Sequence, residues 1–356
     1  MSQRLHAIAA TLGATALLAG IAAVSADDGE AGLLARAQAI FAPLPEAATA
    51  PDRPLTPERV ELGRVLFHET RLSADGKGSC ASCHQPSLYG TDALPGSVGI
   101  AGRVLPRNAP TVFNTALQFV QHYGGNRVDV EEQAVKALLS PLAYGNKDYA
   151  EAEGKLRAIA GYRAMFEKAF PGDAEPVTAV NWGLAIGAFE RTLITPAPFD
   201  RYLAGDTTAL DATQKRGLDK FIATGCAGCH SGATVGGQMY QKFGLTQDYW
   251  LATGSTEQEL LKGRDKGRFH DTKNEADTFI FKVQQLRNVA VTPPYFHDGS
   301  VAKLDDAVRV MAKVQLGRDL PDADVADIVA FLGSLTGDVP KHFAEVPSLP
   351  VAAFSK

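Results

Sequence analysis

All four cysteines of the 356-residue chain fall in two copies of one motif, C-x-x-C-H. This motif is the attachment signature of haem c, in which two thiols bond to the porphyrin and the adjacent imidazole ligates the iron. A Cys₄ zinc site or a thioredoxin-like pair also uses paired cysteines, but neither needs a histidine after both pairs. We therefore expect two covalently bound haem c groups. The motif residues are Cys80, Cys83 and His84, then Cys226, Cys229 and His230.

The ligand on the far side of each iron decides whether a haem only passes electrons or also reacts. Met311 lies just ahead of an apolar helical stripe near the C-terminus, where a cytochrome c supplies its thioether, and we expect it to ligate the iron at His230. The alternatives are that Met311 is a core residue and that Met239, on a loop, is the ligand. No comparable ligand follows the first motif, so the iron at His84 is expected to keep an open site.

The first 26 residues have the pattern of a secretory signal peptide. Arg4 precedes an apolar run, and small residues at positions 24–26 form a cleavage site before Asp27. An uncleaved amphipathic anchor is the alternative. No later apolar run reaches spanning length, so no membrane span is expected after leader cleavage. Because haem c is attached outside the cytoplasm, we expect a periplasmic protein.

The charge balance bears on partners. Removing Arg4 with the leader changes the formal net charge from −5 to −6. No dense basic stripe is present, which argues against a nucleic-acid partner. The acidic balance suits a positively charged electron carrier and equally suits ordinary solubility.

Each haem motif follows a similar amphipathic helix, which indicates an internal duplication. Thr56 is an expected N-cap with Pro57 at the first helical position, and Asp211 is an expected N-cap with Gln214 three residues on. The two helices also share a glycine followed four residues later by a phenylalanine. These pairs are Gly63 with Phe67 and Gly217 with Phe221.

Further helices are expected after each motif. Apolar stripes at helical spacing run from Leu184 to Leu193 and from Val325 to Leu335. The stretches 92–108 and 235–244 are rich in glycine and proline and should be loops around the haem edges. The sequence predicts an all-α fold of two cytochrome c-like haem domains with long irregular loops. The expected units are a signal peptide (1–26), an N-terminal domain (27–200) and a C-terminal domain (201–356), joined near the prolines at 196 and 198.

Several blocks beyond the haem motifs resemble the bacterial di-haem cytochrome c peroxidases and the related enzymes that mature methylamine dehydrogenase. The resemblance covers nearly the whole mature chain, with the blocks in the same order. It implies two all-helical cytochrome domains with a calcium ion between them, a Met-ligated C-terminal haem, and an N-terminal haem where peroxide reacts. The blocks are 106–114, 132–134, 235–240, 265–269, 286–289 and 294–299.

The resemblance also assigns roles to individual residues. Met311 falls on the axial methionine, and Gln133 falls on the distal glutamine of the N-terminal pocket. His297 matches a hydrogen-bonding residue at the edge of the C-terminal haem. The matches to the calcium shell, through side-chain and carbonyl oxygens, are Asn108, Thr292 and Pro294. For Asn108, a turn residue before a proline is the alternative.

Three departures from the family pattern bear on mechanism. Ile100 stands in the loop where many members have a displaceable distal histidine, so the first haem should be open without activation. Tyr123 replaces a tryptophan between the haems and can relay an electron only if its proton has somewhere to go. Ala143 replaces the catalytic glutamate that moves a proton during peroxide cleavage, an effect worth about 10² to 10⁴ in rate. The candidate substitutes for that glutamate are His122, Tyr144 and Asp148.

The resulting expectation is a periplasmic peroxidase that reduces hydrogen peroxide to water with electrons from a small cytochrome c or cupredoxin. Electrons would enter at the Met311 haem, pass by way of Tyr123, and reach the His84 haem, where Gln133 holds the peroxide. One alternative is a protein-modifying oxidase that stores oxidising equivalents on its haems. The other is a two-haem electron carrier without enzymatic activity, which Ala143 favours. Family members often dimerise, so a homodimer is a further expectation.

Overall fold

Helices are the main regular element of the structure, a computed structural model that describes residues 29–254 and 263–351. The predicted leader lies outside these residues. Within them the only sheet has two short antiparallel strands, which agrees with the helix-rich class that the sequence predicts. None of the described helices is both long and apolar enough to cross a bilayer. The α-helices are α1 (Gly29–Ile40), α2 (Pro57–Phe67), α3 (Cys80–Cys83), α4 (Val130–Ala137), α5 (Tyr149–Arg157), α6 (Ala160–Ala169), α7 (Ala179–Glu190), α8 (Pro198–Leu203), α9 (Ala212–Thr224), α10 (Tyr249–Ala252), α12 (Phe269–Thr272), α13 (Leu304–Leu316), α14 (Asp322–Gly333) and α15 (Lys341–Ala344).

Shorter elements connect these helices. The 3₁₀ turns are η1 (Pro86–Leu88), η2 (Ile100–Gly102), η3 (Thr115–Leu117), η4 (Thr207–Ala209), η5 (Cys226–Gly228), η6 (Glu275–Asp277) and η7 (Val289–Val291). The strands are β1 (Tyr240–Lys242) and β2 (Ile280–Lys282), with Gln241 opposite Phe281. Strand β1 lies inside the stretch 235–244, which was expected to be entirely loop. A three-residue strand shows too little alternation to be detected from sequence.

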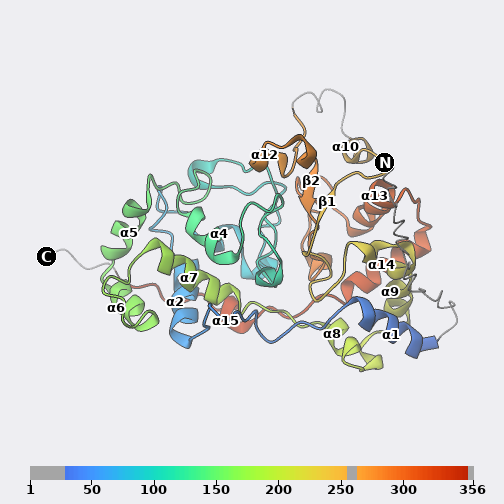
Figure 1. Ribbon diagram of the computed structural model, residues 1–356, viewed down its shortest axis with the longest axis horizontal. Helices are drawn as coiled ribbons and strands as arrows, with labels where there is room; N and C mark the ends of the chain where they lie inside the picture. The colour runs from blue at the N-terminus through green and yellow to red at the C-terminus, as the bar shows by residue number, and fades with distance from the viewer. Residues whose placement is uncertain (1–28, 255–262, 352–356) are drawn as a thin grey trace, which may run out of the picture.

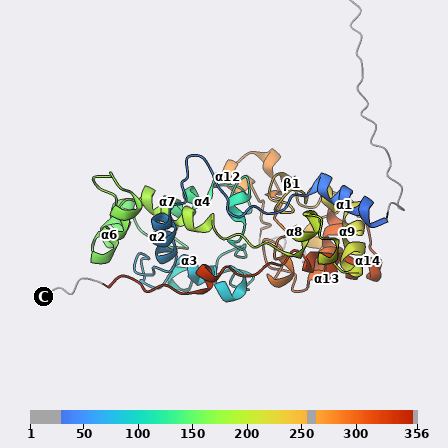
Figure 2. The same cartoon turned by 90° about the horizontal axis from the view of Figure 1, so that it is seen from below.

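Two helix crossings have the same construction at opposite ends of the molecule. α2 packs on α7, and α9 packs on α14 (Figures 1 and 2). A Cβ at Gly63 of α2 would lie 1.9 Å from the Ala185 carbonyl oxygen, and one at Gly217 of α9 would lie 1.8 Å from that of Asp327. Only glycine permits these close approaches. The shared geometry supports the internal duplication.

The N-caps of α2 and α9 are as the sequence predicts. Thr56 Oγ1 accepts from the backbone N–H of Arg59 at 3.3 Å, and Pro57 occupies the first turn. Asp211 and Gln214 form a reciprocal capping box with bonds of 2.8 and 2.9 Å. Both caps satisfy backbone donors that the first helical turn leaves free.

Two hydrophobic cores correspond to the two crossings. One gathers residues of α2 and α4 to α7, and the other gathers residues of α1, α8, α9 and α14. The ends of the chain cross between them, because Leu33 and Phe41 pack in the second core while Phe343 packs in the first. In Figure 1, α1 accordingly lies beside α9, and α15 lies near α2. The domain boundary near residue 200 stays a prediction.

The connection between the cores is held by two asparagines in matching positions. Asn114 and Asn288 each have a left-handed backbone conformation, and each donates a side-chain N–H to Thr195 Oγ1 at 2.9 Å. Their backbone N–H groups bond to the carbonyls of Leu193 and Leu335, which follow α7 and α14. The junction is therefore buried and fully hydrogen-bonded rather than a free linker.

Candidate functional site

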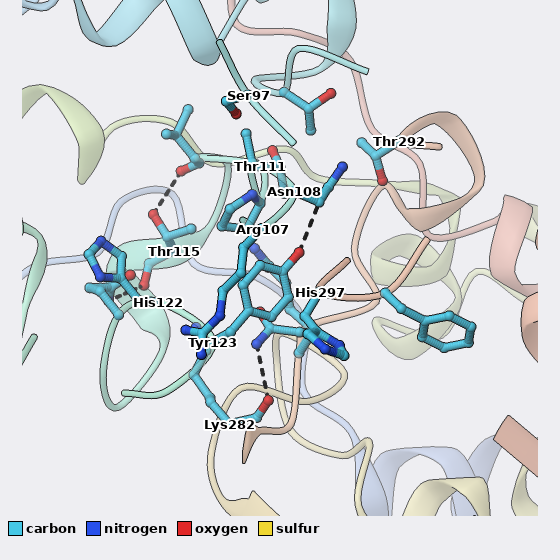
Figure 3. Close-up of a pocket in the computed structure, with 18 of the residues that line it drawn as sticks. Ser97, Arg107, Asn108, Thr111, Thr115, His122, Tyr123, Lys282, Thr292 and His297 are labelled. Atoms are coloured by element: carbon cyan, nitrogen blue, oxygen red, sulfur yellow. Dashed lines mark hydrogen bonds between the residues drawn. The ribbon is translucent and has the colours of Figure 1, made fainter. Parts of the chain in front are cut away.

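A single cavity of about 800 Å³ runs through the middle of the molecule, and both haem motifs line it. The haem-motif residues and the leading candidates for the ligand, distal and calcium roles all contribute to its wall, although these residues come from elements far apart in the chain. They are Cys80, Cys83, His84, Asn108, His122, Tyr123, Gln133, Cys226, Cys229, His230, Thr292, Pro294, His297 and Met311. Figure 3 shows part of this wall.

The first motif is arranged to hold haem. α3 forms one helical turn through Cys80 and Cys83, and neither thiol is in a disulfide. The Nδ1–H of His84 bonds to the carbonyl oxygen of Gly90 at 3.0 Å, which leaves Nε2 as the free ligand atom. Burial lowers the pKa of His84, so the imidazole is neutral, as iron ligation requires.

The second motif repeats this backbone pattern. The N–H of His230 bonds to the carbonyl of Cys226 at 3.0 Å, just as the N–H of His84 bonds to that of Cys80 at 3.0 Å. Burial lowers the pKa of His230 to about 4. A neutral buried imidazole after two free thiols suits a second haem.

Few other side chains on this wall could ligate iron. Besides the two motif histidines, the histidines and methionines that line the cavity are His122, His297 and Met311. Met239 does not line it, and Met165 packs against the first hydrophobic core. Met311 projects from α13 and is the one methionine of the described residues in the cavity wall, as its proposed ligand role requires.

Gln133, Ile100 and Ala143 all lie on the cavity wall. The side chain of Gln133 makes no hydrogen bond to another described residue, so its amide is free to hold a ligand. Ile100 packs closely on its surroundings, since a Cβ at Gly145 would lie 2.3 Å from its Cδ1. The two positions where the family resemblance implies a histidine and a glutamate therefore present apolar side chains to the cavity.

His122 is the best placed of the three substitutes for the missing glutamate. Its Nδ1 lies 2.8 Å from Oδ1 of Asn126, whose Nδ2 donates to Asp271 at 2.8 Å. This orientation of the amide makes Nδ1 the donor, so Nε2 keeps a lone pair. Burial lowers the pKa of His122 to about 4, which keeps the ring neutral near pH 7 and makes Nε2 a weak base.

The other two substitutes are less suited to proton transfer. Tyr144 lines the cavity, but its hydroxyl faces Cys80 Sγ at 3.5 Å, and burial raises its pKa well above the usual value. Asp148 is not on the cavity wall. It is the exposed N-cap of α5 and accepts from the N–H of Glu151 at 2.9 Å, a structural role.

Tyr123 is buried on the wall of the cavity. Its hydroxyl donates to Oδ1 of Asn108 at 3.3 Å (Figure 3), and burial raises its pKa. An amide oxygen is not a base, so no partner is in place to take the phenolic proton. Tyr123 can lie on an electron path, but oxidising the ring is unfavourable where that proton has no acceptor.

The three candidate calcium ligands lie on two loops that a backbone bond joins. The N–H of Asn108 donates to the carbonyl of His297 at 2.8 Å, next to the 292–294 segment. Asn108 Nδ2 donates to the Leu94 carbonyl at 2.7 Å, which leaves its oxygen turned toward Tyr123. Amide and carbonyl oxygens suit Ca²⁺. Among the described residues no group of three or more acidic, cysteine or histidine side chains could hold a metal, so the set would be neutral.

His297 is enclosed by aromatic rings and has an unsatisfied nitrogen. The rings of Phe281 and Tyr249 lie 4.7 and 5.6 Å away, and Nε2 is buried without a hydrogen-bond partner. An orphan buried donor is costly unless a ligand pairs with it. His297 therefore fits its expected place beside a haem edge.

Besides Arg287, which forms an ion pair with Asp200, two buried charged residues on the cavity wall were not predicted. Lys282 of β2 donates through Nζ to Gln118 and to the Val120 carbonyl, and burial lowers its pKa to about 7. Its ammonium suits the propionates of a haem. Glu190 lies at the end of α7 and is 5% exposed. The sequence feature that could have indicated Lys282 and Glu190 is a charged residue within an otherwise apolar segment.

Comparison with known proteins identifies the family. Residues 57–208 match the di-haem cytochrome c peroxidase family. The chain is 42% identical over 319 residues to cytochrome c551 peroxidase of Pseudomonas aeruginosa, with 89% of each chain covered. It is 34% identical over 309 residues to methylamine utilization protein MauG of Methylorubrum extorquens, with 83% of each covered.

A solved structure agrees with these relatives. A crystal structure of a MauG-like protein associated with microbial copper homeostasis superposes with a TM-score of 0.72 at 29% identity, covering 84% of this chain and 96% of the other. Similarity on this scale extends over most of the chain, and both haem motifs line one cavity. The chain therefore belongs to the di-haem cytochrome c peroxidase family, whose members carry two haem c groups.

Proposed function

We propose that this protein is an exported peroxidase that reduces hydrogen peroxide to water with electrons from a small cytochrome c or cupredoxin. The reaction consumes two electrons and two protons for each peroxide and yields two waters. The observation that carries the proposal is the cavity wall, where Gln133 has a free amide and Met311 lies in the half of His230. Its relatives of 39 to 42% identity are named cytochrome c peroxidases.

The chain's own residues have distinct tasks in this proposal. Bound haem supplies the redox-active iron at each motif. Gln133 orients the peroxide by hydrogen bonding, and the apolar contacts of Ile100 limit water beside it. His122 accepts a proton at Nε2. Tyr123 lies between the haems and keeps its own proton.

We also propose calcium binding by Asn108, Thr292 and Pro294, measurable as the calcium content of the purified holoprotein. The halves 27–200 and 201–356 are proposed as two cytochrome c-like units. Export through the leader at 1–26 is proposed on the grounds that haem c is attached outside the cytoplasm.

Ala143 supplies the sharpest test, because it removes the side chain that would move a proton during peroxide cleavage. Ala143→Glu should raise the rate of hydrogen peroxide reduction by about 10² to 10⁴, measured by stopped-flow oxidation of reduced cytochrome c. Ala143→Gln is the matched control, since it has the same size but cannot carry a proton. Equal rates in the two variants would show that proton transfer at this position does not limit turnover.

A second oxidant distinguishes slow proton transfer from slow entry of the oxidant into the cavity. Peroxyacetic acid releases acetate, a leaving group that needs no proton at neutral pH. The wild-type protein should therefore react faster with peroxyacetic acid than with hydrogen peroxide, and Ala143→Glu should narrow that gap. Persistent haem oxidation without donor consumption would instead support the protein-modifying oxidase. No reaction with either oxidant would support an electron carrier.

A further inference from the structure

Glu190 is a buried carboxyl group on the wall of the haem cavity. It ends α7, is 5% exposed, and lines the same cavity as Cys80 and His84. Burial raises the pKa of the Cys80 thiol to about 12, and the charge of Glu190 adds to this rise, which places the carboxyl near the first motif. No described residue forms a hydrogen bond with its side chain, which is rare for a buried charge.

The arginine next to Glu190 is engaged elsewhere. Arg191 donates from Nε and Nη2 to the Glu131 carboxylate at 2.7 and 3.0 Å, and from Nη1 to the Ala48 carbonyl at 3.0 Å. Arg53 adds a longer contact to Glu131 at 3.9 Å. Arg191 and Arg53 therefore pair with Glu131 of α4, and Glu190 is left without an ion-pair partner.

The other groups packed around Glu190 do not compensate its charge. α2 faces α7 with Gly63 and Phe67, which are uncharged. The charge of Glu190 also acts on Cys80, which is a neutral thiol. Burial therefore raises the pKa of Glu190 to about 8, with a further rise from Glu131 and a smaller opposing effect of Arg191.

The second half of the molecule has an aliphatic residue at the equivalent position. Gly63 meets Ala185 and Phe189 at the first crossing, and Gly217 meets Asp327 and Phe331 at the second. Glu190 follows Phe189 just as Leu332 follows Phe331. Both Glu190 and Leu332 line the cavity, so one haem pocket has an ionisable group where the other has leucine.

We propose that Glu190 exchanges a proton with each electron at the haem of His84, while Leu332 leaves the haem of His230 without such coupling. Oxidation adds one positive charge to the haem, and the low dielectric of the pocket makes that charge favour the carboxylate. Glu190 then releases one proton to solvent as one electron leaves, and takes one proton back when the electron returns. The proton would be held on the wall of the cavity that Ala143 also lines.

The sign of the effect follows from linkage. The carboxyl binds its proton more tightly in the reduced protein than in the oxidised protein. Raising the pH therefore favours oxidation and lowers the midpoint potential of the first haem. Full coupling changes the reduction equilibrium tenfold per pH unit, which is about 59 mV for a one-electron couple.

The test is a redox titration of the holoprotein between pH 6 and pH 10, followed by electron paramagnetic resonance, which separates high-spin from low-spin ferric haem. The potential of the first haem should fall with pH, while that of the second haem, measured in the same sample, should change little. Glu190→Gln keeps the size of the side chain and cannot ionise, so it should abolish the slope of the first haem only. Glu190→Leu, which copies Leu332, should do the same.

A flat potential for the first haem in the wild-type protein would overturn the proposal, and so would an unchanged slope in Glu190→Gln or Glu190→Leu. Absorbance of both haems shows whether a variant has folded, and either variant suffices for the decision. The proposal requires haem at His84 but not peroxidase activity. Because potentials are measured without peroxide, a protein that fails to reduce peroxide can still pass or fail this test.

Discussion

The oxygen of Asn108 is the residue-scale feature that joins two proposed roles. It accepts the hydroxyl of Tyr123 at 3.3 Å, and it is also the side-chain oxygen proposed for calcium. A neutral hydrogen bond contributes about 0.5 to 1.5 kcal/mol net. Tyr123 therefore competes for the oxygen that a cation would use.

Tyr123→Phe should consequently strengthen calcium binding by roughly two- to tenfold, the equivalent of one neutral hydrogen bond, measured by competition with a fluorescent chelator. Electron transfer between the haems should change little, because no base is in place for the phenolic proton. Tyr240→Phe is the control, since the Tyr240 hydroxyl contacts Gly125 and Arg268 rather than Asn108. Unchanged calcium affinity in Tyr123→Phe would exclude Asn108 Oδ1 as a ligand.

At the scale of elements, the glycines at the two helix crossings set how closely the helices beside each haem motif pack. α2 approaches α7 so closely that a Cβ at Gly63 would lie 1.9 Å from a backbone oxygen and 2.8 Å from Phe189 Cβ. Neither atom belongs to a flexible side-chain end. The helices must therefore separate to accept any larger residue, which would also move Glu190 at the end of α7.

Gly63→Ala should destabilise the protein by about 1 to 3 kcal/mol or more, because it overpacks the crossing. Gly217→Ala should have a similar effect at the second crossing. Gly154→Ala is the control: Gly154 lies within α5 with no atom near its Cβ position, so alanine should stabilise the helix by about 0.5 to 1 kcal/mol. Denaturant unfolding followed by circular dichroism measures all three, and a neutral Gly63→Ala would contradict the close crossing.

The helices and caps were predictable because their signals are local. A few neighbouring residues are enough to recognise the N-caps Thr56 and Asp211 and the apolar stripe of α14. Strands β1 and β2 were missed because three residues pair across about forty others. Glu190 was missed because its neighbours Ile186, Phe189 and Leu193 form an ordinary core stripe, and only alignment with Leu332 in space shows the substitution.

The cavity residues also divide into those that local sequence predicts and those that depend on the folded chain. Haem attachment at Cys80 and Cys226 follows from spacing alone, the position ahead of the last apolar helix indicated Met311, and the family resemblance indicated Gln133. The hydrogen bond from Tyr123 to Asn108 and the amide orientation at His122 depend on loops that meet only in the folded chain. No local pattern could have predicted them.

At the scale of the whole molecule, each core is completed by the opposite end of the chain. Phe343 is fully buried and packs on Phe67 and Phe113 at ring distances of 5.6 and 5.3 Å. Leu33 and Phe41 likewise pack with α8 and α9 residues in the second core. Together with the Asn114 and Asn288 bonds to Thr195, these exchanges bind the halves into one body.

Phe343→Ala should therefore destabilise the protein by about 3 to 5 kcal/mol, the range for a fully buried phenylalanine. The measurement is denaturant unfolding of the holoprotein. Val346→Ala is the control, because Val346 is 73% exposed and should change stability by about 0.5 kcal/mol or less. Equal stability of the two variants would show that the C-terminal segment contributes nothing to the first core.

This exchange of ends has a consequence for biosynthesis. The chain emerges from its N-terminus, so Cys80 and Cys83 appear long before α15 does, and the first core lacks Phe343 throughout that interval. An unsealed pocket leaves both thiols open to the enzymes that join them to porphyrin. If porphyrin is joined during that interval, the final residues would close the earlier half around it, and the first half to be synthesised would be the last to be completed.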